Sequence, residues 1–261
     1  MASHSTLSIH TAHPDLCAIC SNTHLVHIGD KDFGISGCDY FEGRRIFADY
    51  GVAIPYYECR HCNFIFTNAF DHWTNEHWRE HVYNDGYVLA DPPFLSERPA
   101  RNAQMIASLF YRELPEISIL DVGGGNGKMT DELRKCGADI QSHDPIYGND
   151  AMPRDRCFDL ITSFEVVEHV PHFRQCEWIG NVTDLLRKAT AARFLLSTEV
   201  SQPYRSISWW YICPRNGHIS IHSPLSLEIL AKRVGMDVHS INPSMHLLSW
   251  QKQKQIVALA A

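Results

Sequence analysis

A run of glycines directly after a short apolar segment is the feature that most constrains this chain. The stretch ILDVGGGNGKM, residues 119–129, sets Asp121 at the end of an apolar run and places four glycines in the next six positions. Glycine costs conformational entropy and is favoured where the backbone takes a positive φ or where another group approaches closely. A helical pattern follows over residues 128–136, so the sequence predicts a strand, a glycine turn and a helix.

The glycine turn favours one class of ligand over another. A helix N-terminus behind such a turn aims backbone N–H groups at a negatively charged group, as sites for nicotinamide dinucleotides and S-adenosylmethionine do. A dinucleotide fingerprint has the spacing G-x-G-x-x-G, and Lys128 and Thr130 stand where its third glycine would be needed. The spacing therefore argues against a dinucleotide. Close packing of the helix on the strand remains the alternative without a ligand.

A second candidate ligand contact stands further along the chain. The stretch ADIQSHDP predicts a strand that ends at Asp144, where a carboxylate can accept hydrogen bonds from both hydroxyls of a ribose. An Asp-Pro turn is the alternative for this residue. Further strands are predicted in CFDLITSFEVVEHV and ARFLLSTEV, and a helix capped by Ser223 is predicted to begin at Pro224. Residues 236–241 and 245–250 predict a closing hairpin.

Charge and composition limit the class of protein. The 261 residues have a formal net charge of -7 and are 44% hydrophobic, which suits a folded domain with a real core. An acidic chain lacks the positive surface charge with which proteins bind a phosphate backbone, so nucleic acid is an unfavourable partner. The first residues do not resemble a signal peptide, and no apolar run approaches bilayer length. We therefore expect a cytoplasmic protein with no membrane partner.

Four of the nine cysteines form two C-x-x-C knuckles. They are Cys17, Cys20, Cys59 and Cys62. Two such knuckles can present four thiolates to one tetrahedral zinc ion, and the stretch between them, which includes RIFADYGVAIPYYE, predicts short strands. The sequence therefore predicts a small zinc-ribbon-like module, with Cys38 and His61 as alternative ligands. A redox pair or unrelated thiols are the alternatives without zinc, although no βαβ pattern surrounds either knuckle.

The segment between the two parts is rich in aromatic residues and histidines. His77 and His81 would share a helical face, but without the H-E-x-x-H order packing is favoured over a second metal site, and the same holds for His72. An amphipathic helix is predicted from Ser96 to Leu114. The predicted divisions are a flexible N-terminus over 1–13, a zinc-binding module over 14–70, a connecting segment over 71–95 and an α/β domain over 96–261.

Together these motifs resemble the S-adenosylmethionine-dependent methyltransferases that carry an N-terminal zinc-binding domain. The likeness covers nearly the whole chain and rests on the paired cysteine knuckles and on ILDVGGGNGK, HDP, FDLITSFEVVEHV and WWYICPRNGHISIHSPLSLEILAKRVGM. Many members of this family modify sugars or other small molecules. The resemblance implies an α/β fold with a Rossmann-like class I methyltransferase sheet, mostly parallel with an antiparallel last strand.

The resemblance also implies roles for individual residues. Asp121 and the glycine turn would hold the methionine part of S-adenosylmethionine, Asp144 would hold its ribose, and Phe164 and Glu165 would form the wall near the sulfonium. The glycines of the turn are Gly123, Gly124, Gly125 and Gly127.

The chain departs from the family pattern at three places. The stretch between Asp144 and Phe158 is too short for the usual helix and third strand, so this edge strand is expected to be short or missing. LLRKATAARF stands where a proline-glycine-glycine turn usually precedes the fifth strand. The extra C-terminal domain of the larger sugar C-methyltransferases is not present in this sequence.

Candidate catalytic residues follow from the chemistry of the acceptor. A hydroxyl must lose its proton near the transition state, and histidine suits that task at neutral pH. His218, in the loop after the predicted fifth strand, is the first candidate base and His169 is the second; hydrogen-bonded structural roles are the alternatives. Tyr211, in the WWY stretch, is the third candidate catalytic residue. This stretch could form an apolar or sugar-stacking wall of the site.

The function expected from the sequence is methyl transfer from S-adenosylmethionine to a small, hydroxylated or sugar-like acceptor such as a nucleotide sugar, with structural zinc. Two other hypotheses stay open. An RNA or protein methyltransferase that grips its target through the zinc module would show a basic surface stripe. A zinc-binding interaction protein with a degenerate pocket would not bind S-adenosylmethionine. The sequence assigns no oligomeric state.

Overall fold

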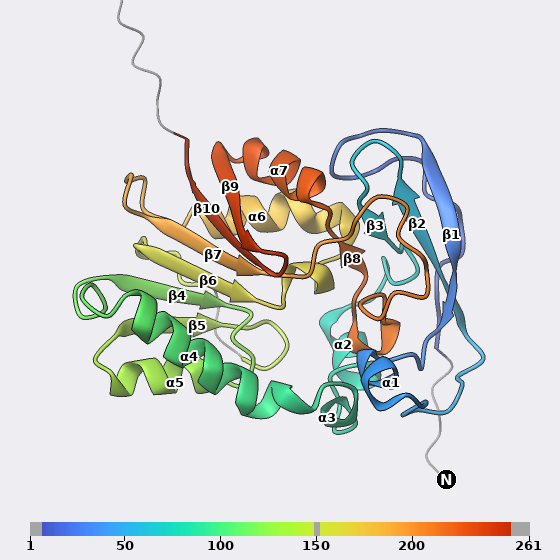
Figure 1. Ribbon diagram of the computed structural model, residues 1–261, viewed down its shortest axis with the longest axis horizontal. Coiled ribbons are helices and arrows are strands. Elements are labelled where there is room, and N and C mark those ends of the chain that lie inside the picture. The colour runs from blue at the N-terminus through green and yellow to red at the C-terminus, as the bar shows by residue number, and fades with distance from the viewer. Residues whose placement is uncertain (1–6, 149–151, 252–261) are drawn as a thin grey trace, which may run out of the picture.

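The computed structural model describes residues 7–148 and 152–251 and contains two β-sheets (Figure 1). The larger sheet has six strands in the order β5-β4-β6-β7-β10-β9. These strands are β4 (Ser118–Val122), β5 (Asp139–His143), β6 (Leu160–Phe164), β7 (Arg193–Ser197), β9 (Met236–Asn242) and β10 (Met245–Trp250). Of these strands β4 comes first in the sequence, yet it lies inside the sheet. The chain therefore adds strands on both sides of β4.

The direction of the strands confirms the predicted fold class. β4 pairs in parallel with β5 and β6, and β6 pairs in parallel with β7. β10 runs antiparallel to both of its neighbours and forms the predicted hairpin with β9. In the described residues, which leave out 149–151, no strand lies between β5 and β6, as expected from the short connection there.

Helices cover both faces of the large sheet (Figure 1). α4 (Glu97–Leu109) and α5 (Lys128–Lys135) lie on one face, and α6 (Gln175–Thr183) and α7 (Pro224–Arg233) lie on the other. Because side chains alternate along a strand, Ile119 of β4 packs with α4 and α5, whereas Leu120 packs with α6 and α7. The sheet is therefore buried on both faces, as parallel sheets usually are.

Two predicted helix boundaries can be compared with the structure. α7 begins at Pro224 as expected, and the Ser223 hydroxyl accepts the N–H of Ser226 at 3.1 Å. α4 ends at Leu109, earlier than the predicted Leu114. Phe110 already leaves the helical conformation, with φ -113° and ψ 24°, and Pro115 prevents any continuation past Leu114, because it has no N–H to donate and disfavours the helical conformation of the residue before it.

The smaller sheet has four antiparallel strands in the order β1-β2-β3-β8. They are β1 (Leu25–Asp32), β2 (Ala53–Cys59), β3 (Ile65–Phe66) and β8 (Ser220–Ile221). Of the stretch RIFADYGVAIPYYE only the part in β2 is a strand. The residues before it turn around the Asp32 carboxylate, which accepts the N–H groups of Tyr50 and Gly51.

β8 joins two regions that are far apart in the sequence. The chain leaves the large sheet after β7, and β8 then pairs with β3, with Ile221 opposite Ile65. One hydrophobic core contains residues from 33–90 and from 211–221. The remaining helices lie in this part of the molecule: α1 (Gly37–Glu42), α2 (Asn75–His81) and α3 (Tyr87–Ala90). Within the described part of the chain, four 3₁₀ turns cover Pro92–Leu95, Val167–His169, His172–Arg174 and Pro214–Asn216.

The segment 7–13 is hydrogen-bonded to the connecting segment. The carbonyl of Ser8 accepts the indole N–H of Trp73 at 3.0 Å, and the carbonyl of Ala69 accepts the N–H of His10 at 2.8 Å. Residues 1–6, which belong to the predicted flexible N-terminus, lie outside the described residues. Across 7–148 and 152–251, each helix is too short or too polar to span a bilayer.

Candidate active site

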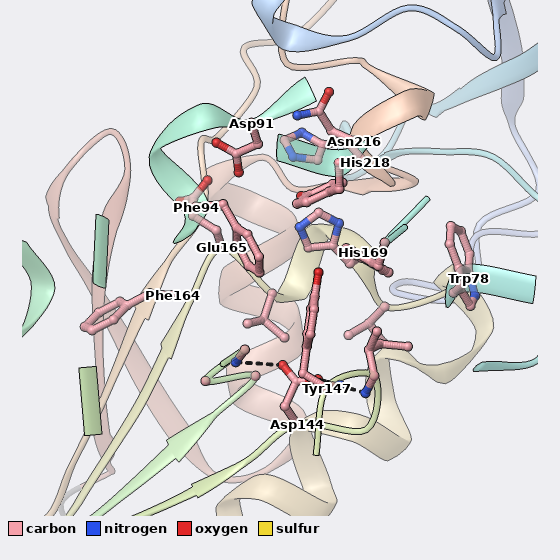
Figure 2. A pocket seen from close by; sticks show the side chains of 18 of the residues that line it. Trp78, Asp91, Phe94, Asp144, Tyr147, Phe164, Glu165, His169, Asn216 and His218 are labelled. Atoms are coloured by element: carbon pink, nitrogen blue, oxygen red, sulfur yellow. Dashed lines mark hydrogen bonds between the residues drawn. The ribbon is translucent and has the colours of Figure 1, made fainter. Parts of the chain in front are cut away.

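A cavity of about 790 Å³ opens at the carboxyl edge of the large sheet (Figure 2). The turns that follow β4, β5 and β6 line it, and so do residues from the segments 73–94 and 210–218. In open α/β sheets, ligands bind at this edge of the strands. The cavity therefore lies where the fold offers a binding site, and it is within the usual size range for small-molecule pockets.

The glycine turn forms part of the cavity wall and has little room for side chains. A Cβ on Gly123, whose φ is +75°, would lie 2.3 Å from Val166 Cγ2. A Cβ on Gly124 would lie 2.5 Å from Asp121 Oδ2. Gly125 has a φ of +57° and would meet only the Phe94 ring, at 3.4 Å. The first two glycines are therefore required by the protein itself, whereas Gly125 faces the space that a ligand can enter.

Asp121 lies beneath the glycine turn at the end of β4. Its side chain is buried, and Oδ1 accepts a hydrogen bond from the Thr162 hydroxyl at 2.9 Å. Burial raises the pKa of Asp121 to about 7, and the negative charge of Asp144 acts in the same direction, while the Thr162 hydrogen bond opposes them. A cationic ligand group beside this carboxyl would favour its ionised form.

Asp144 connects the second strand to the glycine turn. Its Oδ2 accepts the N–H of Gly125 at 2.8 Å, and its Oδ1 accepts the N–H groups of Ile146 at 2.8 Å and Tyr147 at 3.0 Å. The carboxylate thus closes the Asp-Pro turn that the sequence offered as an alternative role. A carboxylate has about four lone-pair positions, so three N–H donors leave it capacity for a further donor from the cavity.

Two neighbouring glutamates follow β6, and Tyr211 connects them. The Tyr211 hydroxyl lies 2.7 Å from Glu168 Oε1 and 3.3 Å from Glu165 Oε2, while Ser197 donates to Glu165 Oε1 at 2.8 Å. Glu168 is fully buried, and among the described residues its Oε2 has no hydrogen-bond partner. Burial raises the pKa of both carboxyls to about 7, and the charge of Glu168 raises that of Glu165 further.

His169 and His218 lie side by side, with ring centroids 5.0 Å apart (Figure 2). Nδ1 of His169 is 3.0 Å from the carbonyl oxygen of Gly217, and Nδ1 of His218 is 2.9 Å from that of Tyr211. A carbonyl only accepts hydrogen bonds, so Nδ1 carries the proton in both rings and Nε2 keeps its lone pair. Burial lowers the pKa of both imidazoles, that of His218 well below its ordinary value, so both are neutral at pH 7.

The structure brings nearly all of the predicted cofactor and catalytic residues to this one cavity. Gly127 is the exception, since it caps the start of α5 and does not line the cavity. The predicted residues that do line it are Asp121, Gly123, Gly124, Gly125, Asp144, Phe164, Glu165, His169, Tyr211 and His218.

Several lining residues were not predicted from the sequence. Tyr83, Tyr87 and Asp91 come from the connecting segment, and Asp91 forms a two-pronged ion pair with Arg98, with both N–O distances 2.7 Å. Their spacing of four residues resembles one helical face, but only Tyr87 lies in a helix, so no local signal identified the three as neighbours. Glu168 was likewise given no role from the sequence.

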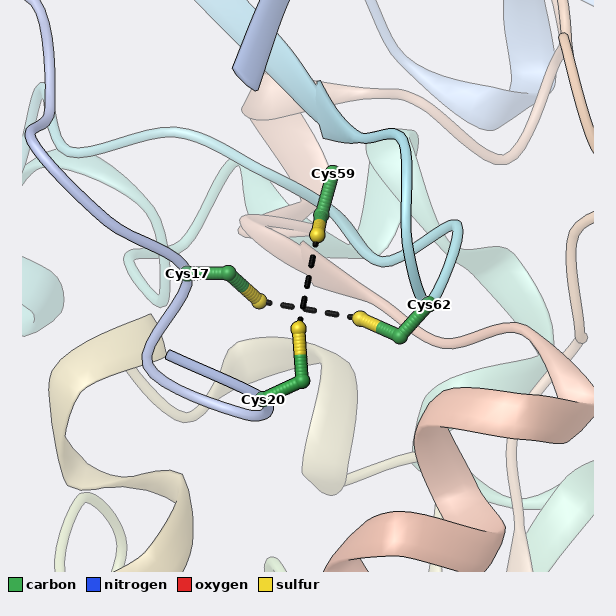
Figure 3. Close-up of side chains that lie close together, drawn as sticks. All are labelled: Cys17, Cys20, Cys59 and Cys62. Atoms are coloured by element: carbon green, nitrogen blue, oxygen red, sulfur yellow. Dashed lines mark hydrogen bonds between the residues drawn. The ribbon is translucent and has the colours of Figure 1, made fainter. Parts of the chain in front are cut away.

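The four knuckle cysteines form a separate cluster beside α6 and α7 (Figure 3). Cys17 Sγ lies 3.6 Å from Cys62 Sγ, and Cys20 Sγ lies 3.5 Å from Cys59 Sγ. Four thiolates around a zinc ion at 2.3 Å would be separated by about 3.8 Å, so the donors fit a tetrahedral ion after a small outward movement. Cys38 and His61 are not members of this cluster.

Comparison with known proteins adds a family match. A family described as a methyltransferase domain matches residues 94–241, more than half of the chain. A search of curated proteins found no match.

Solved structures give distant similarities. Magnesium protoporphyrin IX methyltransferase (ChlM) from Synechocystis PCC 6803, solved with bound SAH, is 14% identical, with 67% of this chain and 94% of that chain covered and a TM-score of 0.43. The pyocyanin biosynthetic protein PhzM is 16% identical, with 62% and 58% covered and a TM-score of 0.47. The 1,6-didemethyltoxoflavin-N1-methyltransferase from Burkholderia thailandensis is 13% identical, with 67% and 84% covered and a TM-score of 0.45.

Proposed function

The chain belongs to the methyltransferase domain family, and from that premise we propose that this S-adenosylmethionine-dependent methyltransferase modifies a hydroxyl group of a small, sugar-like or otherwise hydroxylated molecule. One observation carries the proposal. The glycine turn and Asp144 share a single cavity with two neutral imidazoles, so a methyl donor and an acceptor hydroxyl can meet there.

The residues around the glycine turn suit S-adenosylmethionine. Gly125 leaves its face of the turn open, Asp144 keeps acceptor capacity for ribose hydroxyls, and Asp121 offers a carboxyl to the cationic amino group. Phe164 and Glu165 also line the cavity. When bound, S-adenosylmethionine supplies an activated methyl carbon that bonds to the acceptor oxygen as the carbon–sulfur bond breaks and its electron pair stays on sulfur.

The histidine pair suits removal of the acceptor proton. His218 is the first candidate base and His169 the second, because each keeps a lone pair on Nε2 and each lines the cavity. Tyr211 orients the site by contacting Glu165 and Glu168. The low pKa of His218 keeps it unprotonated through the physiological range, so it is ready to accept a proton, although as a weak base.

The aromatic walls favour a small acceptor over a polymer. Trp78, Tyr83, Tyr87, Phe94 and Tyr147 line the cavity and offer faces on which a sugar or another ring can stack. The net charge of -7 is unfavourable for a nucleic-acid substrate.

The proposal also includes a zinc ion, held in the cysteine cluster beside α6 and α7. Residues 14–70 act as a zinc-binding module in which Cys17, Cys20, Cys59 and Cys62 hold one structural ion. Residues 71–95 connect this module to the methyltransferase domain over 96–261 and supply part of the cavity wall.

A label-transfer experiment tests the function. The protein is incubated with S-adenosylmethionine labelled in its methyl group and with a cell extract separated into small molecules, RNA and protein. We expect the label in the small-molecule fraction, in a form stable to mild base, as a methyl ether is. Label confined to RNA or protein, or no transfer to any fraction, would contradict the proposal.

A further inference from the structure

Glu168, His169 and His218 form a second cluster of metal-ligating side chains, separate from the four cysteines. One carboxylate oxygen and one nitrogen from each ring lie within 4.8 Å of one another. We propose that these three side chains hold a divalent cation that binds and activates the acceptor hydroxyl. The inference deepens the proposed function and rests on it for the reaction, but it changes which group removes the proton.

The hydrogen bonds of the two rings prepare them to bind an ion. Gly217 and Tyr211 accept the Nδ1–H groups, which fixes the tautomer and leaves Nε2 of both His169 and His218 as the bare nitrogen. Metal-binding histidines usually donate their other N–H to a carbonyl or carboxylate in this way, which orients the ring. A structural histidine does not require a second ring beside it that also keeps a bare nitrogen.

Glu168 gives an independent indication of a missing partner. Its side chain is fully buried, yet Oε2 accepts no hydrogen bond from any described residue. An unsatisfied buried oxygen costs free energy, and a carboxylate costs more than a neutral group. Tyr211 holds Oε1 at 2.7 Å, and the Thr198 hydroxyl also acts on this carboxyl and lowers its pKa. Because Oε1 is the oxygen that faces His169, a cation bound by both carboxylate oxygens would satisfy Oε2 as well.

The distances suit one ion after modest movement. Glu168 Oε1 lies 3.9 Å from His169 Nε2. Neighbouring ligands about 2.1 Å from one ion lie about 3.0 Å apart at octahedral angles and about 3.4 Å apart at tetrahedral angles, so this pair must close by about 1 Å and the widest pair by at most about 2 Å.

The surrounding charge also favours a cation. Glu165 and Glu168 lie on either side of the Tyr211 hydroxyl. Arg98 acts on both carboxyls and lowers the pKa of each, but it is also held by Asp91 in a two-pronged ion pair. Because Arg98 shares its charge with Asp91, the two glutamates are only partly neutralised.

The ligand set indicates the kind of ion and acceptor. Two imidazoles and one carboxylate suit Mn²⁺, Fe²⁺ or Zn²⁺ better than Mg²⁺ or Ca²⁺, which prefer oxygen ligands only. An octahedral ion would keep three open positions. The acceptor hydroxyl and a neighbouring oxygen of the same molecule can fill two of them, so the acceptor class is a molecule with adjacent oxygens.

The ion, and not the imidazole of His218 or His169, would then promote deprotonation of the acceptor hydroxyl. A divalent cation lowers the pKa of an oxygen it binds. The O–H bond of the acceptor then breaks with its electron pair left on oxygen, and the proton passes to water. His169 and His218 act as ligands and stay neutral throughout.

Metal binding can be tested without measuring methyl transfer. The purified protein, with the cysteine site intact, is analysed for total metal and titrated with Mn²⁺ while free Mn²⁺ is followed by electron paramagnetic resonance. We expect one ion per chain beyond that held by the cysteines. Glu168→Gln, His169→Asn and His218→Asn should each weaken Mn²⁺ binding at least about tenfold. Glu168→Gln keeps the shape of the side chain, and S-adenosylmethionine binding checks that each variant is folded.

His172→Asn is the matched control, since His172 is also buried but contacts Asp71 and does not line the cavity. It should bind Mn²⁺ as the wild type does. Absence of a second ion, or Mn²⁺ affinity unchanged in all three ligand variants, overturns the inference. Methyl transfer that proceeds equally after removal of the second ion also overturns it and leaves the proposed function standing. An ion bound at this site without any methyl transfer to a small molecule would instead contradict the proposed function.

Discussion

Asp121 is a single residue whose burial under the glycine turn changes the pKa of its carboxyl. Burial raises its pKa from 3.8 to about 7, so the folded protein keeps a proton that the unfolded chain releases. The stabilising effect of that proton is fully present below the unfolded pKa and is lost as the pH rises through the folded pKa. Asn at this position does not titrate.

We therefore expect the stability of the wild type relative to Asp121→Asn to fall by roughly 3 kcal/mol from pH 5 to pH 8, at 1.4 kcal/mol for each unit up to 7. Urea unfolding of both proteins at the two pH values measures this difference, and the effects of other titrating groups cancel. A difference that does not change with pH would show that Asp121 is ionised in the folded protein.

His218 is the residue on which the proposed chemistry depends most. His218→Ala should leave S-adenosylmethionine binding nearly unchanged and lower turnover about 100-fold or more, as loss of a base or of an activating ligand does. Because burial depresses the pKa of His218, protonation of this ring should lower the rate only in acidic solution, and that decrease should be missing from His218→Ala, unlike any change caused by Glu165 and Glu168, whose pKa is about 7. Rate profiles of both proteins with the acceptor found by label transfer provide the measurement. Turnover retained in His218→Ala would exclude the residue from the reaction.

At the scale of elements, the two cysteine knuckles form short loops that pack on α6 and α7, where Arg233 donates to the carbonyl of Ile19. Replacing Cys59 and Cys62 together with Ala should remove one zinc ion per chain relative to the wild type and lower the melting temperature, because folding loses the free energy of metal binding. Metal analysis and thermal unfolding measure both effects. Cys136→Ala and Cys157→Ala, at exposed positions away from the cluster, serve as controls. Zinc retained in the double variant would place the ion elsewhere.

β8 is the element that joins the two sheets. Ile221 is fully buried there and lies opposite Ile65 of β3. Ile221→Ala should cost about 2–5 kcal/mol of unfolding free energy through lost burial and a cavity. Leu225→Ala, at a half-exposed position four residues later, should cost much less. Equal losses in the two variants would mean that β8 does not contribute to the shared core.

For the whole molecule, local sequence patterns predicted the large sheet and one side of the site. The glycine turn, Asp144 and the capped helix at Ser223 are each encoded within a few neighbouring residues, and the structure places them as expected in the fold. The other side of the cavity depends on packing between distant segments. Nothing near Tyr83 or Tyr87 indicates that they face His169, and β8 has only two residues, too few for a period to be recognised.

The central claim is that the cavity beside the glycine turn binds S-adenosylmethionine through Asp144. Calorimetric titration of the wild type, Asp144→Ala and the His172→Asn control with S-adenosylmethionine tests it directly. We expect one molecule bound per chain, affinity about 10- to 100-fold weaker in Asp144→Ala because charge-assisted hydrogen bonds are lost, and no change in the control. The wild type should not bind NAD. No binding of S-adenosylmethionine by the wild type, or equal affinity in Asp144→Ala, would contradict the account.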